Sequence, residues 1–105
     1  MDIQKLMQQA QKMQQDMEKA QAELANERVE ASAGGGMVSV VATGTGDILS
    51  VKIDPEGVDP DDIEMLEDMV LAAVNEAHRM AADVSNQRMS AMMPPGAGGL
   101  GLPGM

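Results

Sequence analysis

This chain of 105 residues is first notable for what it lacks. It contains no cysteine, which excludes disulfides, thiolate metal sites and a cysteine nucleophile. It contains no Phe, Tyr or Trp, whereas Met occurs twelve times. Because aromatic side chains usually supply much of the buried area of a core, we expect a small core of Met, Val, Ile, Leu and Ala. A second subunit would complete so thin a core, which favours a homodimer.

Positive charge is also scarce. Seven Lys and Arg stand against seventeen acidic residues, which gives a net charge of −10. Eight of the acidic residues, and no basic one, fall within residues 54–68. The global charge disfavours nucleic acid as a partner, but acidity confined to one segment leaves room for a binding surface elsewhere. The acidic segment lacks the ligand spacing, the glycine and the final Glu of an EF-hand, so we predict no metal site.

Signals for catalysis, secretion and membrane insertion are missing too. The chain has one histidine, His78, and no nucleophile motif surrounds any of its serines, so we predict that it is not an enzyme. The first residues lack the basic and then apolar order of a signal peptide, and no apolar run is long enough to span a membrane. We therefore expect a soluble cytoplasmic protein without a cofactor or a small-molecule substrate.

Residues 1–26 carry an uninterrupted seven-residue apolar repeat. Two positions of each heptad form the seam, which consists of Ile3, Leu6, Ala10, Met13, Met17, Ala20 and Leu24. This pattern is typical of a helix that packs along another helix. Gln fills most of the other positions, and no helix breaker interrupts the segment. Because the seam is narrower than the apolar stripe of an ordinary core helix, we expect part of this helix to project from the body.

The middle of the chain shows the two-residue period of β-strands. Polar and apolar residues alternate over residues 28–33, and three consecutive glycines, 34–36, then predict a turn. Residues 37–43 and 48–54 form two further predicted strands, separated by a second turn at 44–47. Three short strands joined by tight turns predict an antiparallel meander.

A second long helix follows. Asp59 is a candidate N-cap with Pro60 at the first helical position, and the apolar pattern continues to about Gln87. This pattern is again a heptad seam, so we expect the two long helices to pack together, and the sequence leaves open that their partners come from a second chain. Residues 69–74 are apolar nearly all round the helix, and we expect them to be the most buried part of the protein.

The prolines and glycines after the second helix predict a boundary. We expect a folded domain over residues 1–89 and a flexible Gly/Pro/Met-rich tail over residues 90–105. The domain is predicted to be α+β, with the order α-β-β-β-α. The two open edges of its sheet favour a homodimer again. The residues expected at the dimer interface are Val38, Val40, Leu49, Val51, Val70 and Val74.

One pattern suits a nucleic acid. Lys5, Lys12 and Lys19 are spaced by seven, so they form a row on one side of the first helix, over about 20 Å. Three cations at this pitch suit the phosphates of a nucleic-acid backbone. The alternative is an ordinary solvated helix face, because Asp16 and Glu23 lie on the same stripe and Asp16 can pair with Lys19.

The succession of segments resembles the YbaB/EbfC family of bacterial nucleoid-associated proteins over about residues 3–85. The resemblance rests on six segments, which are residues 5–7 (KLM), 11–14 (QKMQ), 34–40 (GGGMVSV), 53–56 (IDPE), 65–68 (MLED) and 72–77 (AAVNEA). Each segment alone is weakly diagnostic, but their combined order is specific.

The resemblance implies a homodimer whose sheets join and whose long helices project like tweezers. It further implies duplex DNA as the partner, bound with little sequence preference, and a place on the bacterial chromosome. Family DNA contacts lie on the projecting helices, which here implies Lys5, Lys12 and Lys19 on the first helix and Arg79 and Arg88 on the second. The sequence also leaves open a protein-interaction adaptor, in which the heptad seams and Met-rich surfaces bind partner proteins.

Overall fold

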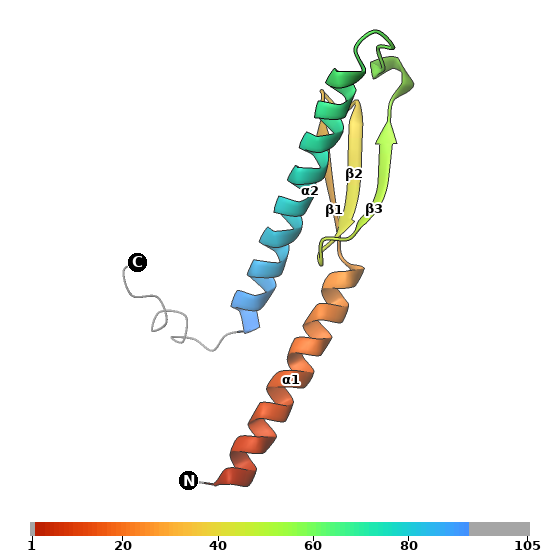
Figure 1. Ribbon diagram of the computed structural model, residues 1–105. Helices are drawn as coiled ribbons and strands as arrows, with labels where there is room; N and C mark the ends of the chain where they lie inside the picture. Colours follow the sequence, from red (N-terminus) through yellow and green to blue (C-terminus); the bar gives the residue numbers. More distant parts are fainter. Residues whose placement is uncertain (1, 93–105) are drawn as a thin grey trace, which may run out of the picture.

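The computed structural model describes residues 2–92 (Figure 1). Its elements are α1 (Ile3–Asn26), β1 (Arg28–Ala33), β2 (Val38–Thr43), β3 (Ile48–Ile53), the 3₁₀ helix η1 (Pro55–Gly57) and α2 (Ile63–Met92). The predicted α-β-β-β-α order is confirmed, and each strand lies within a residue of its predicted bounds. Within the described residues, no helix is both long enough and apolar enough to cross a membrane.

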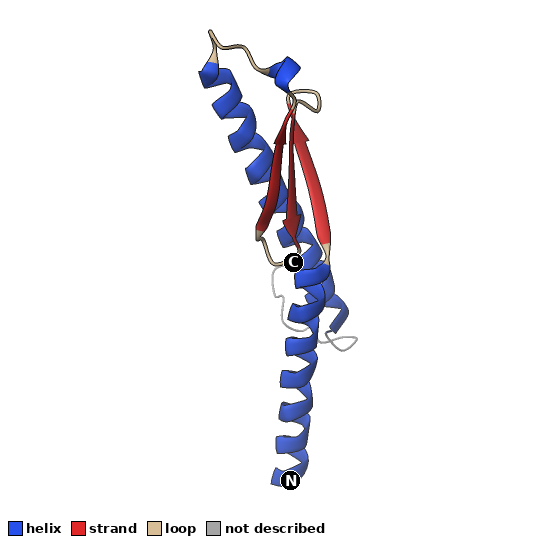
Figure 2. Ribbon diagram, turned by 90° about the vertical axis from the view of Figure 1, so that its right-hand side faces the viewer, coloured by secondary structure: helices blue, strands red, loops and turns tan. Residues whose placement is uncertain are grey.

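The three strands form an antiparallel sheet in the order β1-β2-β3. α2 crosses one face of this sheet and packs on β1 and β2 (Figure 2). The residues that meet there are fully or nearly fully buried, and they are Val38, Val40 and Ala42 on β2 and Ala73, Ala77 and Ala81 on α2. Alanines four residues apart lie on one side of a helix, so α2 presents a row of small side chains to the sheet. Larger, partly buried side chains such as Met69 and Val70 flank this row.

The start of α2 differs from the prediction. The helix begins at Ile63 rather than at Pro60, because the preceding aspartates form a turn of their own. The carboxylate of Asp59 accepts a hydrogen bond from the amide of Asp61 at 2.9 Å, which is the local bonding that aspartate offers a turn. Asp62 then takes the capping role, because its carboxylate accepts from the amide of Met65 at 3.2 Å.

The end of α2 lies further along the chain than expected. The helix continues to Met92, so residues 90–92, which we assigned to the tail, are helical. The rest of the predicted tail, residues 93–105, lies outside the described residues.

Burial along α2 also differs from the prediction made from the sequence. Within residues 69–74 only Ala73 is buried, whereas Leu71 is 60% exposed. The sheet covers only one side of α2, so the apolar side chains on its other side remain exposed.

The two long helices do not pack along each other, contrary to the prediction. α2 uses its buried side against the sheet. Among residues 2–92, α1 contacts the other elements only near its own C-terminal end, where Ala20 and Leu24 are buried. The rest of α1 projects from the body (Figure 1), which confirms that expectation from the sequence. Its seam is uncovered, with Ile3 71% exposed and Met13 63% exposed.

The projecting helix gives the molecule an elongated shape of 71 × 32 × 16 Å. The radius of gyration is 19.8 Å, whereas a compact chain of this length has about 13 Å. The free end of α1 lies at one end of the molecule, and η1 and the start of α2 lie at the other (Figure 1).

Candidate nucleic-acid interface

The lysine row lies along the projecting helix. Asp2 caps α1, since its carboxylate accepts from the amide of Gln4 at 3.0 Å. The outer half of the helix, residues 3–15, contains two lysines and no acidic residue. Lys5, Lys12 and Lys19 are all exposed, and the row spans about 21 Å at 1.5 Å per residue.

The lysines are not neutralised by neighbouring side chains. Among residues 2–92, none of the three forms an ion pair, and the pairing of Asp16 with Lys19 considered from the sequence does not form. The structure therefore leaves three uncompensated cations on one side of a helix that stands clear of the acidic body.

A glycine in the turn between β2 and β3 holds the C-terminal end of α1, which we call the base of this helix. Only Glu27 separates α1 from β1, and the preceding Leu24 is 1% exposed. The amide of Gly44, in the turn between β2 and β3, donates to the carbonyl oxygens of Leu24 and Glu27 at 3.0 and 3.2 Å. A Cβ atom on Gly44 would lie 2.8 Å from the carbonyl oxygen of Leu24, so only glycine allows the turn to approach this closely.

Arg88 forms a second link between α1 and the body. Its guanidinium, on the last turns of α2, pairs with the carboxylates of Glu23 and Glu27 at the end of α1. The side chain is 29% exposed. Arg88 was predicted as a DNA contact, but in the structure its charge is compensated by two carboxylates and its guanidinium joins the two helices.

Arg79 is compensated in a similar way. Its Nε donates to Glu76 at 3.0 Å, and its Nη1 donates to Asp83 at 2.8 Å. The hydrogen bonds from the Arg79 side chain lower the pKa of Glu76, and this acid in turn raises the pKa of Arg79. Both arginines predicted to contact DNA therefore lie in ion pairs, in contrast to the three lysines.

The densest cluster of acidic residues lies away from the lysine row. Residues 54–68, with eight acidic side chains, form η1 and the start of α2, at the end of the molecule opposite the tip of α1 (Figure 1). In the part of the chain that the structure describes, no group of three or more His, Asp or Glu is arranged to hold a metal ion. The fold thus separates this acidic cluster from the lysine row by most of the length of the molecule.

The residues predicted at a dimer interface fall into two groups. Val38 and Val40 are fully buried under α2, so they belong to the core of the chain and are not free to face a second copy. Leu49 and Val51 on β3 are 50% and 44% exposed, because α2 covers β1 and β2 but not this edge strand. Val70 and Val74 are half-buried at the border of the α2 packing.

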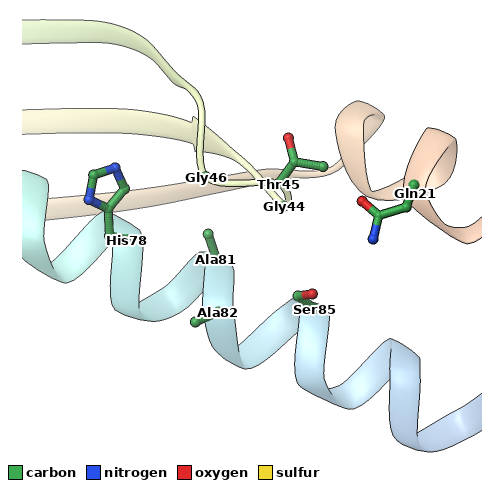
Figure 3. Close-up of a pocket in the computed structure, with 8 residues that line it drawn as sticks. All are labelled: Gln21, Gly44, Thr45, Gly46, His78, Ala81, Ala82 and Ser85. Carbon is green, nitrogen blue, oxygen red and sulfur yellow. The ribbon is translucent and has the colours of Figure 1, made fainter.

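A cavity of about 490 Å³ lies between α2, the end of α1 and the turn between β2 and β3 (Figure 3). Its titratable side chain is His78, and its hydroxyls belong to Thr45 and Ser85. His78 and Ser85 lie two turns apart on α2, or about 10 Å along the axis, and Figure 3 shows the imidazole directed toward the sheet. A nucleophile and its base need to be within hydrogen-bond reach, so His78 and Ser85 do not form a catalytic pair.

The sequence did not predict the contacts that hold the base of α1. A Gly-Thr-Gly segment was interpreted only as a turn, and nothing in the local pattern places Gly44 against the end of a helix twenty residues earlier. Glu23 and Glu27 are four residues apart, which would be repulsive on an isolated helix. The repulsion between these two carboxylates was the signal in the sequence that a cation, here Arg88, pairs with both of them.

Comparison with known proteins gives consistent results. A family model described as the YbaB/EbfC DNA-binding family matches residues 1–97. A nucleoid-associated protein of Ruminiclostridium cellulolyticum is 56% identical over 101 residues, which cover 95% of this chain and 84% of the relative. A nucleoid-associated protein of Pelotomaculum thermopropionicum is 51% identical over 104 residues, covering 99% of this chain and 95% of the relative.

Among solved structures, the chain is similar to the crystal structure of an uncharacterized protein from Helicobacter pylori. The TM-score is 0.80, and the match covers 90% of this chain and 99% of that one. At 21% sequence identity this likeness establishes the fold alone.

Proposed function

Because the chain belongs to the YbaB/EbfC DNA-binding family, we propose that it binds duplex DNA through the lysine row of α1. The observation that carries the proposal is the absence of ion pairs at Lys5, Lys12 and Lys19 among the described residues, on a helix that projects from an otherwise acidic protein. Free ammonium groups release the counterions of DNA phosphates when they bind, which supplies the favourable free energy.

The proposed binding has little sequence preference. Lysine carries a compact charge on a flexible stem, and contacts of this kind position a protein on the phosphates without reading base edges. The two arginines, which suit bidentate base contacts better, are held in ion pairs with acidic residues of α1 and α2. We therefore propose that Arg79 and Arg88 contribute less to the DNA contact than the lysines.

The protein is further proposed to act as a homodimer. Leu49 and Val51 expose an apolar strip on β3, and the half-buried Val70 and Val74 lie at the neighbouring border of α2. Covering this strip with the same strip of a second copy would complete the small core and remove an open sheet edge. The dimer would carry two lysine rows with about six cations, which supports non-specific binding at low salt.

The relatives named nucleoid-associated proteins support a place on the bacterial chromosome, and we propose the same role here, without a catalytic activity. We assign DNA binding to residues 1–89. Residues 54–68 are proposed to face away from the DNA, because eight acidic side chains would repel phosphates.

The test is a titration of fluorescent duplex DNA at several salt concentrations. Wild-type protein is compared with the variant Lys5→Glu/Lys12→Glu/Lys19→Glu, whose three exposed positions leave the core untouched. We expect wild type to bind and to lose affinity as salt rises, and the variant not to bind at any concentration tested. Equal binding by both proteins would move the DNA site away from α1. Binding that does not respond to salt would favour the adaptor, because apolar docking releases no counterions.

A further inference from the structure

The projecting half of α1 carries a row of glutamines beside its lysines. Residues 3–15 contain six glutamines, and the spacing of four of them places these on one side of the helix. These four residues, which we call the glutamine row, are Gln4, Gln8, Gln11 and Gln15. The row extends over about 16 Å at 1.5 Å per residue, and at about 100° per residue its centre lies about 70° around α1 from the lysine row.

The side-chain amides of the glutamine row are available to a partner. All four side chains are exposed, on the part of α1 that projects from the body (Figure 1). Among residues 2–92, none of these amides takes part in a hydrogen bond. Because each amide has both N–H donors and a carbonyl acceptor, the row presents a line of groups that can donate and accept.

The use of glutamine rather than an acid favours an anionic partner. Glutamine and glutamate form helices about equally well, so either would suit an exposed position that contacts only water. On α2 the chain has acids at such positions, for example Glu64, Glu67 and Asp68, whereas residues 3–15 of α1 contain none. A neutral amide beside the lysines keeps its hydrogen-bonding groups and does not repel phosphates.

The dimensions of α1 suit the major groove of duplex DNA. A helix with its side chains is about 10–12 Å across, and the major groove is about 12 Å wide. With about 70° between the two rows, the glutamines can face the base edges while the lysines on the flank meet the phosphates of one strand. The apolar seam of α1 lies about 150° from the glutamine row and would face out of the groove.

We propose that the glutamine row contacts base edges in the major groove and gives the binding a modest preference for A·T base pairs. This inference rests on the proposed function, because the lysine row has to bring the helix to the DNA. A glutamine amide accepts from N6 of adenine and donates to N7 at the same time, which is the bidentate pair that this side chain forms. The preference is modest because exposed, flexible side chains lose conformational entropy when they bind.

Two matched double variants of the full-length protein test the proposal. Gln8→Ala/Gln15→Ala removes two amides of the row, whereas the control Gln9→Ala/Gln14→Ala removes two exposed amides that lie about 90° or more away around the helix. Alanine is the best helix former, so both variants should keep the circular dichroism of wild type. Binding to an A·T-rich and a G·C-rich labelled duplex of equal length is measured by fluorescence anisotropy at several salt concentrations.

We expect wild type and the control to bind the A·T-rich duplex about fivefold more tightly than the G·C-rich one, which is the lower limit of discrimination by one glutamine–adenine pair. Gln8→Ala/Gln15→Ala should bind the A·T-rich duplex about fivefold more weakly than wild type does, and should thereby lose the preference. Its dependence on salt should equal that of wild type, because no charge has been removed.

Equal affinity of wild type for the two duplexes would overturn the proposal, and so would an equal loss of preference in the control. A loss of the same size on both duplexes in Gln8→Ala/Gln15→Ala would also overturn it, because the glutamines would then contact the backbone. These outcomes differ from a failure of the proposed function, in which wild type binds neither duplex and the inference falls with it.

Discussion

The substitution of a single lysine allows the number of phosphate contacts to be measured. Each phosphate contact changes the slope of log K against log salt by about −0.9, so six contacts in a dimer give about −5.4. Replacing Lys12 by Gln removes two of the six and should reduce the slope to about −3.6. Between 50 and 200 mM salt, the affinity should then fall about 150-fold instead of about 2,000-fold.

The assay is fluorescence anisotropy of a labelled duplex at four or more salt concentrations. The matched control is Lys52→Gln, which removes the same charge from an exposed position on β3, outside the lysine row. Its slope should equal that of wild type. A slope for Lys12→Gln that equals the wild-type slope, or a decrease of the same size in Lys52→Gln, would refute the reasoning that the row meets the backbone.

Three further predictions concern the base of α1, and urea denaturation followed by circular dichroism measures each of them. Leu24→Ala should lower the free energy of unfolding by about 3 kcal/mol, because Leu24 is 1% exposed and the substitution leaves a cavity; a loss below 1 kcal/mol would contradict its burial. Gly44→Ala should cost about 1–3 kcal/mol, because the added methyl group meets the carbonyl of Leu24 at 2.8 Å; a stabilised variant would refute this close approach. Arg88→Gln should cost about 1 kcal/mol, because the ion pairs with Glu23 and Glu27 are partly solvent-screened; an unchanged midpoint in urea would show that they contribute nothing.

Local patterns in the sequence were enough to predict the elements and their order. Alternation over residues 28–33 and three consecutive glycines identified the first hairpin, because each strand and turn depends on neighbouring residues. The start of α2 was misplaced because Asp59 and Asp62 are both good caps, and the sequence does not show which of them the turn uses for itself.

The packing partners of the helices could not be predicted in the same way. A heptad seam predicts that a helix has an apolar side, but it does not identify the surface that covers it. The seam of α2 packs on the sheet, whereas the seam of α1 is left open over most of its length. The lysine row was visible from spacing alone, and so was the spacing of Arg79 from Glu76 and Asp83 on the same helix. The pairing of Arg88 with Glu23 and Glu27 depends on the fold, because more than sixty residues separate them in the sequence.

The most direct test of the central claim is to map which part of the protein touches the DNA. Because the chain has no cysteine, a photoactivatable cross-linker can be attached to a single new thiol, either at Gln15→Cys between the lysines of α1 or at Glu56→Cys in the acidic segment. We expect duplex DNA to cross-link to the label at position 15 and not to the label at position 56. Cross-linking from position 56 alone would contradict the account.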